Sequence, residues 1–177
     1  SFLIRTHGLN LAEVGTVLAL VSGLSGAIGT FLGGYLGDRF GGSDKRWYLW
    51  IPMLGIALAY FPYLYMLLTD NTTAGLSVLF FALVLKTLYL GPCIAIAHLL
   101  VPAGMRALTS AVLFFVLNMI GLGLGPFLTG LTSDLLQPSY GDESLRYSMV
   151  ITTQMSLVAI AMFALAARRL PADLAKC

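Results

Sequence analysis

The 177-residue sequence has very little charge. Its ten Lys and Arg and eight Asp and Glu residues make up only 10% of the chain, whereas apolar residues make up 58%. A soluble domain typically carries about 25% charged and 45–50% apolar residues, so this chain has too little polar side chain to cover a surface in water. The composition argues against a soluble enzyme, a nucleic-acid-binding protein and a disordered chain. It predicts a membrane-embedded protein.

Cysteine is also scarce, and no local pattern typical of an active site is found. Cys93 lies in an apolar run and Cys177 ends the chain, which does not predict a disulfide framework or a metal cluster. We find no nucleophile–base pair and no phosphate-binding glycine loop, and no secretory signal opens the sequence. We therefore expect no enzyme activity, no cofactor and no metal. The net charge of +2 is too small to indicate a nucleic-acid partner.

The few charges are clustered and leave long neutral stretches between them. Each stretch exceeds the roughly 20 residues that a helix needs to cross about 30 Å of hydrocarbon. The long, uniformly apolar runs do not fit transmembrane strands, which are short and alternate in polarity. The neutral stretches predict five membrane-spanning helices, at residues 12–37, 47–69, 75–101, 107–134 and 146–167.

The positions of lysine and arginine predict the orientation in the membrane. Arg5 and Arg146 lie on one side of the five spans, and Lys86 lies within the third. The other seven lie on the opposite side: Arg39, Lys45, Arg46, Arg106, Arg168, Arg169 and Lys176. By the positive-inside rule, the C-terminus is cytoplasmic and Ser1 is external. Because an external start without Met or a signal is unusual, we expect the sequence to be part of a longer multi-pass protein of the plasma (bacterial inner) membrane.

Small residues and prolines distinguish several spans. Gly29, Gly33 and Gly37 recur every fourth position in the first span, which predicts close helix packing, either static or as a sliding interface. The pairs Gly91-Pro92 and Gly125-Pro126 predict hinges, because proline removes a backbone hydrogen bond and glycine softens the helix. Bent helices are typical of transporters, although channels and receptors also have them.

A short connection between the first two spans carries a recognisable motif. Residues 34–46 read GYLGDRFGGSDKR, which resembles the G-x-L-A-D-R-x-G-R-R loop of the major facilitator superfamily. Gly37 replaces the usual alanine, and three residues intervene before the basic pair. The residues that match the motif are Gly34, Gly37, Asp38, Arg39, Gly41, Lys45 and Arg46.

A second stretch is similar to the spinster-like branch of that superfamily. It runs from Val101-Pro102 through Arg106, Asn118 and the glycines before Pro126 to Ser133-Asp134. The resemblance implies an all-α, twelve-helix membrane fold, of which this chain supplies the eighth to twelfth helices in the C-terminal six-helix bundle. Residues 1–10 would then end the seventh helix or follow it, and the N-terminal half of the protein would be missing from this sequence and would be its partner.

Lys86 is the strongest candidate for a binding residue. It lies near the middle of its span, where a lone lysine costs several kcal/mol unless it faces water or a partner. It is expected to attract an anionic head group or carboxylate, with Tyr89 on the same face; the alternative is a structural pair with a missing helix or a carbonyl. Asn118, near the middle of the fourth span, could bind substrate or bond across helices. The resemblance implies that both helices line the cavity.

The resemblance also implies a conformational latch in the motif. Asp38 would accept hydrogen bonds from the N-terminus of a neighbouring helix and from an arginine, which would hold the inner side closed. The plain alternative is ordinary interfacial charge at Asp38 and Arg39. Gln154 is expected to have a structural role, and His98 is expected to lie at the membrane interface. No carboxylate lies at the centre of a span, so a proton-coupling group would have to lie in the missing half.

Two functions remain open from the sequence. The first is part of a secondary active transporter that moves a small organic or amphiphilic solute, such as an organic anion or a lysolipid, by alternating access, with proton coupling undecided. The second is a membrane receptor or scaffold that keeps the fold without transporting. The expected partners are a small-molecule solute, the lipid bilayer and the N-terminal half, and no nucleic acid.

Overall fold

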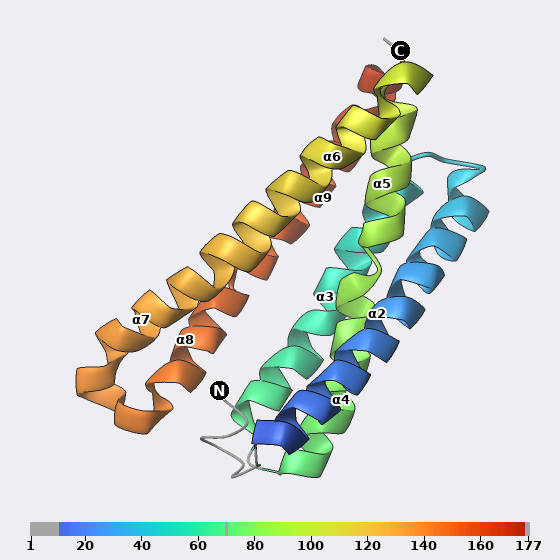
Figure 1. The fold of residues 1–177 in the computed structure, drawn as a ribbon. Coiled ribbons are helices and arrows are strands. Elements are labelled where there is room, and N and C mark those ends of the chain that lie inside the picture. Colours follow the sequence, from blue (N-terminus) through green and yellow to red (C-terminus); the bar gives the residue numbers. More distant parts are fainter. Residues whose placement is uncertain (1–10, 70, 176–177) are drawn as a thin grey trace.

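The computed structural model describes residues 11–69 and 71–175, and this part of the chain is helical without a strand (Figure 1). The expected end of a preceding helix at residues 1–10 lies outside the described residues. The α-helices are α2 (Leu11–Gly41), α3 (Trp47–Leu68), α4 (Thr72–Thr87), α5 (Leu90–Leu99), α6 (Arg106–Val116), α7 (Gly125–Tyr140), α8 (Ser144–Thr153) and α9 (Met155–Leu174). A π-helix joins α6 to α7 at Leu117–Leu124, and two short 3₁₀ turns occupy Ala103–Met105 and Gly141–Glu143.

These elements form five helical segments that are long and apolar enough to cross a bilayer. The segments are Ala19–Gly41, Trp47–Leu68, Ser77–Leu99, Ala103–Tyr140 and Ser144–Leu174. The predicted all-α membrane fold with five spans is confirmed. The fourth segment extends beyond the expected 107–134, because the polar residues that follow it stay helical up to the turn at Gly141–Glu143.

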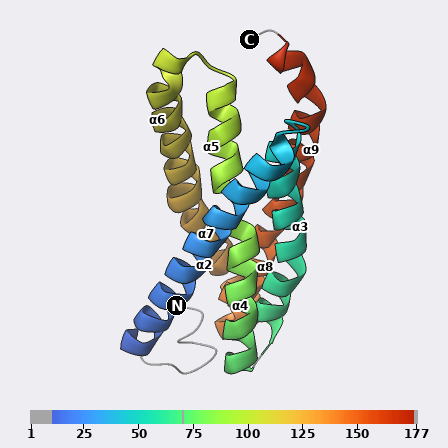
Figure 2. The same cartoon turned by 90° about the vertical axis from the view of Figure 1, so that its right-hand side faces the viewer.

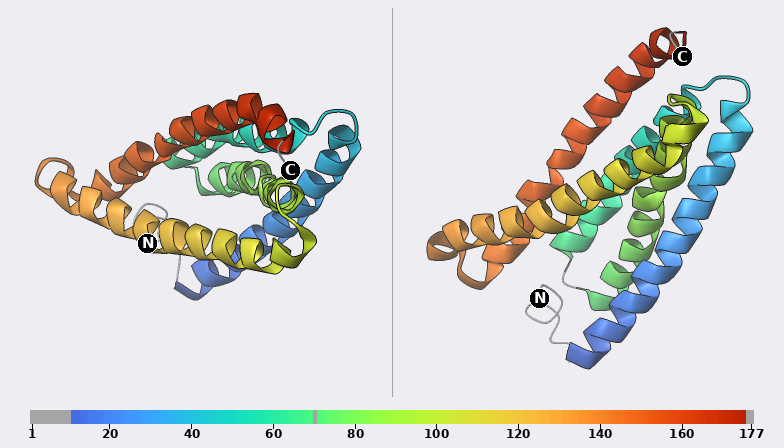
Figure 3. Two further views of the ribbon diagram at one scale, coloured as in Figure 1. Left: turned by 90° about the horizontal axis from the view of Figure 1, so that it is seen from above. Right: turned by 45° about the horizontal axis from the view of Figure 1, so that its top comes forward.

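The helices form a compact group and a projecting arm. Within the group, α3 packs against α4 and α9, and α2 packs against α4 and α5. The arm consists of α6, the π-helix, α7 and α8, and α7 packs mainly against α8. Seen from above, α5 lies between the α3–α9 pair and the long α6–α7 helix (Figure 3). In the view of Figure 2, α6 runs beside α5 and α9 runs beside α3.

The basic residues gather at one end of the molecule. The α2–α3 connection, the α5–α6 turn and the C-terminal end of α9 all lie there (top of Figure 1). This arginine-rich end carries Arg39, Lys45, Arg46, Arg106, Arg168 and Arg169. Arg146 lies at the opposite end, whereas Arg5 and Lys176 lie outside the described residues. The described basic residues that the sequence assigns to one side of the spans thus lie at one end of the structure. Which side of a membrane this end faces stays a prediction.

The buried core is small for the number of apolar residues. One cluster centres on Leu67 between α3 and α4, and another brings Leu49 of α3 against Leu170 of α9. Many large apolar side chains are exposed, including Phe61 and Leu122, each at 74%. A soluble protein rarely exposes so much contiguous apolar surface. This surface suits contact with acyl chains and with further helices.

Candidate functional site

The glycines of α2 allow this helix to approach the α4–α5 junction closely. A Cβ added to Gly29 would overlap the Thr87 hydroxyl, and one added to Gly33 would overlap the carbonyl oxygen of Leu88. Thr87 also donates a hydrogen bond of 3.3 Å to the carbonyl oxygen of Ser25 in α2. Helices in lipid associate through such close contacts between small residues. The small-residue stripe therefore forms a packed interface, and whether it slides is a separate question.

The same stripe continues into the motif at residues 34–46, at the arginine-rich end. A Cβ on Gly37 would lie 3.2 Å from the Tyr48 ring and 3.4 Å from the Pro92 ring. A Cβ on Gly41 would clash with the same tyrosine. Two glycines of the motif thus make room for the first turn of α3. A Cβ added to Gly34 would meet nothing within 4 Å, so close packing does not explain the glycine at this position.

The third span is interrupted close to its middle. Helix α4 ends at Thr87 and α5 begins at Leu90. Pro92 has no N–H, so the carbonyl of Leu88 has no donor four residues further along the chain. That carbonyl faces the backbone of Gly33 instead. The predicted hinge residues Gly91 and Pro92 lie in the first turn of α5, directly after this break at Leu88–Tyr89, and bending there stays a prediction.

Lys86 lies directly before this break, in the last turn of α4. Its side chain is exposed, and its Nζ lies 5.0 Å from the centroid of the Tyr63 ring of α3. Within the described residues, no ion pair joins it to a carboxylate. Two features favour the ammonium: the ring face attracts a cation, and the C-terminal end of a helix is negative. Tyr63 was not foreseen, because sequence spacing does not reveal a contact between neighbouring helices.

The other two predicted binding residues lie apart in the fold. Tyr89 is half-buried at the break, three residues after Lys86. Asn118 belongs to the π-helix, where its Nδ2 donates a 2.7 Å hydrogen bond to the carbonyl oxygen of Phe114. The π-helix packs against α6 and α7, whereas α4 packs against α2 and α3. Tyr89 thus lies near Lys86 in the chain, whereas Asn118 lies on the arm. The binding roles of all three residues stay predictions.

The second predicted hinge, Gly125-Pro126, lies at the end of the π-helix. Pro126 occupies the start of α7, where its missing N–H costs least. Added Cβ atoms on Gly121 and Gly123 would meet nothing within 4 Å. π-Helical turns are rare and occur frequently at functional sites. The sequence predicts a flexible helix near Gly125 and Pro126, and in the structure the residues directly before them form the π-helix Leu117–Leu124.

The charged residues of the motif make mainly local contacts. Asp38 accepts a 3.2 Å hydrogen bond from the hydroxyl of Tyr48, in the first turn of α3. Arg39 donates to the Tyr35 hydroxyl at 3.1 Å, and the Lys45 Nζ lies 5.8 Å from the Tyr48 ring centroid. The expected contact between Asp38 and the next helix is therefore through a side chain. Within the described ranges, no arginine bonds to Asp38.

Comparison with known proteins supplies the family. No family model matches the chain. A curated relative from Mycolicibacterium smegmatis (strain ATCC 700084 / mc(2)155), named as an MFS-type efflux pump, is 36% identical over 178 residues, covering 98% of this chain and 41% of the relative. A bacterial homologue of the human lysosomal transporter Spinster, inward-facing and unoccupied, superposes with a TM-score of 0.88 at 27% identity. Its inward-facing, occupied form gives 0.80 at 28%.

The chain belongs to the major facilitator superfamily. Its solved neighbours support the spinster-like resemblance as well. Each structural match covers 97% of this chain but only 43% or 44% of the neighbour. The chain thus spans about two fifths of the length of the relatives it matches, which agrees with the expected assignment to the C-terminal part of the superfamily fold.

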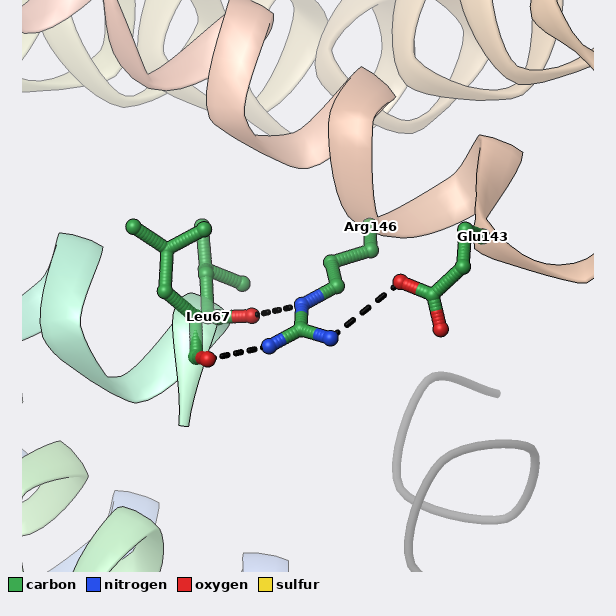
Figure 4. A network of polar contacts seen from close by, with 4 residues as sticks. Leu67, Glu143 and Arg146 are labelled. Atoms are coloured by element: carbon green, nitrogen blue, oxygen red, sulfur yellow. Dashed lines mark hydrogen bonds and ion pairs between the residues drawn. The ribbon is translucent and has the colours of Figure 1, made fainter. Parts of the chain in front are cut away.

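Arg146, which contributes to the predicted topology, also joins two helices in the structure (Figure 4). Its Nε donates a 2.6 Å hydrogen bond to the carbonyl oxygen of Leu67, and its Nη2 donates to the carbonyl of Leu68. Its Nη1 lies 3.2 Å from the Glu143 carboxylate. Arg146 therefore satisfies the last carbonyls of α3, which a helix end leaves without partners. In the sequence, only the three-residue spacing of Glu143 and Arg146 indicates a contact of this arginine, and it does not indicate the contact with α3.

Other polar contacts also connect helices of the bundle. Gln154 accepts a 2.8 Å hydrogen bond from the Tyr60 hydroxyl, in keeping with its expected structural role. The remaining pairs are His98–Ser110 at 2.7 Å, Ser133–Ser144 at 3.3 Å and Ser148 to the Thr129 carbonyl at 2.5 Å. They join α5 to α6 and α7 to α8. These groups serve packing, which leaves the region around Lys86 as the candidate site.

Proposed function

We propose that this chain is part of a secondary transporter of the major facilitator superfamily that carries an anionic, amphiphilic solute. The observation that supports it best is Lys86, an exposed cation in the middle of an apolar span. A charge at this depth is costly unless it faces a water-filled cavity or a ligand. The relatives named as an efflux pump and as Spinster homologues support transport as the activity.

The interrupted helix beside Lys86 favours solute binding at this depth. Discontinuous helices near the midplane place free backbone dipoles beside a solute in many transporters. Here Leu88 and Tyr89 separate two helical pieces, and the Tyr63 ring supplies an apolar, electron-rich wall. A cation next to aromatic and aliphatic surface suits a molecule with both an acidic and an apolar part, such as an organic acid or a lysolipid.

Alternating access requires the two halves of the transporter to rock around this site. We propose that the absent N-terminal half covers the exposed face that holds Lys86. The bond between Asp38 and Tyr48 would help to hold the arginine-rich end, taken as cytoplasmic, in one conformation. The protein would lie in the plasma membrane, which is the inner membrane of a bacterium, with its C-terminus inside.

The test uses the full-length protein in proteoliposomes loaded with fluorescent lysolipids of matched chain length. The anionic lysolipid should be transported by wild type and by Lys86→Arg, and at least about tenfold more slowly by Lys86→Ala. Arg168→Gln, which removes an exposed charge from the end of α9, is the control. Equal rates for Lys86→Ala and wild type would disprove the assigned role of Lys86.

The same assay separates transport from the alternative function. A receptor or scaffold would bind the anionic lysolipid without moving it across the membrane. Flux measured with and without an imposed proton gradient then decides whether the transport is proton-coupled. Binding without flux under either condition would contradict the proposed function.

A further inference from the structure

A groove lies between α3 and α9, whereas Lys86 lies beside the helix break between α4 and α5. It has a volume of about 330 Å³, within the roughly 300–1,000 Å³ range of small-molecule sites. Its lining is entirely apolar, and consists of Leu49, Ala159, Met162, Phe163 and Ala166. Such a groove is suited to an acyl chain, but its lining alone does not say what fills it.

Two arginines lie at the arginine-rich mouth of this groove. Arg46 precedes Leu49 by three residues, and Arg169 follows Ala166 by three, so each shares a helix face with a lining residue. Helix α3 begins at this end of the bundle and α9 ends there (Figure 2). The two arginines therefore extend the edges of the groove at its basic end.

Neither guanidinium is neutralised within the part of the chain that the structure describes. Arg169 is exposed and Arg46 half-buried, and neither side chain has a hydrogen bond or ion pair with a described residue. The nearby carboxylates that the structure describes do not pair with these guanidinium groups. Asp44 accepts the backbone N–H of Arg46 at 2.9 Å. Asp173 lies one turn beyond Arg169 and has an interaction of its own. Two positive charges thus remain available at the groove mouth.

The first turn of α3 adds to the positive potential and fixes the depth in the membrane. The turn itself contains no acidic residue, and the Asp44 carboxylate, which accepts the Arg46 backbone N–H, offsets only part of the positive end of the helix dipole. The Trp47 ring contacts the tilted Phe40 ring and the edge-on Trp50 ring, with ring centroids 5.0 and 5.5 Å away. Tryptophan is enriched at the level of lipid head groups. These aromatic rings suit the level of lipid head groups at the mouth of the groove.

We propose that this groove binds an anionic phospholipid from the leaflet at the arginine-rich end. One acyl chain would occupy the apolar groove between α3 and α9, and the phosphate-bearing head group would contact Arg46 and Arg169. Charge complementarity at the mouth decides between an anionic and a zwitterionic lipid. Basic pockets between spanning helices on the cytoplasmic side are typical head-group sites. This lipid is a bound partner, separate from the transported solute.

The experiment measures how much lipid the full-length protein retains. Protein reconstituted with equal amounts of phosphatidylglycerol and phosphatidylcholine is extracted in mild detergent, and bound lipid is counted by native mass spectrometry. Wild type should retain phosphatidylglycerol selectively. Each arginine should contribute about fivefold, so Arg46→Gln/Arg169→Gln should lower the retention of phosphatidylglycerol by roughly 25-fold.

Two further variants keep the test decisive if the double variant does not fold. Arg46→Lys/Arg169→Lys should retain phosphatidylglycerol within about twofold of wild type, because the charge is kept. Ala166→Phe should fill the groove and lower retention with both arginines present. Arg106→Gln/Arg168→Gln, at the same end and with the same change in net charge, is the control. A loss in this control equal to that in the groove variant, or undiminished retention in Ala166→Phe, would overturn the proposal.

Discussion

The interlock between α2 and the α4–α5 break makes Gly33→Ala the most informative single substitution. The new Cβ would overlap the Leu88 carbonyl oxygen and lie only 2.8 Å from its carbonyl carbon and 3.0 Å from its Cα. All three are backbone atoms, so no side-chain rotation can relieve the contact. Helix α2 would have to move away from the junction. Overpacking of this kind costs about 1–3 kcal/mol.

A cost of this size changes the folding equilibrium constant of the protein by roughly 5- to 150-fold. Unfolding of the full-length protein in dodecyl maltoside, titrated with SDS and followed by circular dichroism, should report it. Gly23→Ala is the matched control, because Gly23 lies on the same helix and its new Cβ would meet nothing within 4 Å. The reasoning fails if Gly33→Ala unfolds at the same SDS fraction as wild type, or if both variants are destabilised equally.

Substitutions at three further contacts give separate tests. Arg146→Ala should destabilise the protein by about 1.5–3 kcal/mol in the same titration, because it removes charged hydrogen bonds to the α3 carbonyls; Glu143→Gln, whose side chain is 49% exposed, should cost less than about 1 kcal/mol. Asp38→Asn should slow solute exchange in proteoliposomes more than it weakens solute binding, and Tyr48→Phe should do the same if their hydrogen bond is the relevant contact. Tyr63→Leu should weaken binding of an anionic lysolipid by severalfold, whereas Tyr63→Phe keeps the ring and should bind normally; equal affinities for the two would remove the ring from the site.

The sequence was most informative where one physical requirement dominates. A span must be about 20 residues long and nearly free of charge, so the neutral stretches predicted five spans and the side on which the basic residues gather. Proline chemistry is equally local, because the residue itself removes the N–H. A disturbance of the helix near Pro92 could therefore be expected from the chain alone, and the structure places the break just before it, at Leu88–Tyr89.

Contacts between distant segments could not be predicted in this way. Arg146 reaches a carbonyl 79 residues earlier, and nothing in local periodicity specifies that pair. The position of the Lys86 ammonium against Tyr63 likewise depends on how α3 and α4 are rotated. The π-helix at Leu117–Leu124 was also missed, since its composition is that of an ordinary apolar helix.

The close approach of α2 to the α4–α5 junction also determines where labels can report motion. Backbone contacts at Gly33 and Gly91 hold α2 closely against the α4–α5 junction, so sliding would require the helices to separate first. A pair of spin labels on α2 and α5 should therefore keep one distance throughout a transport cycle. A pair on α2 and α7 spans the boundary between the compact group and the arm, and is the pair to choose for following conformational exchange.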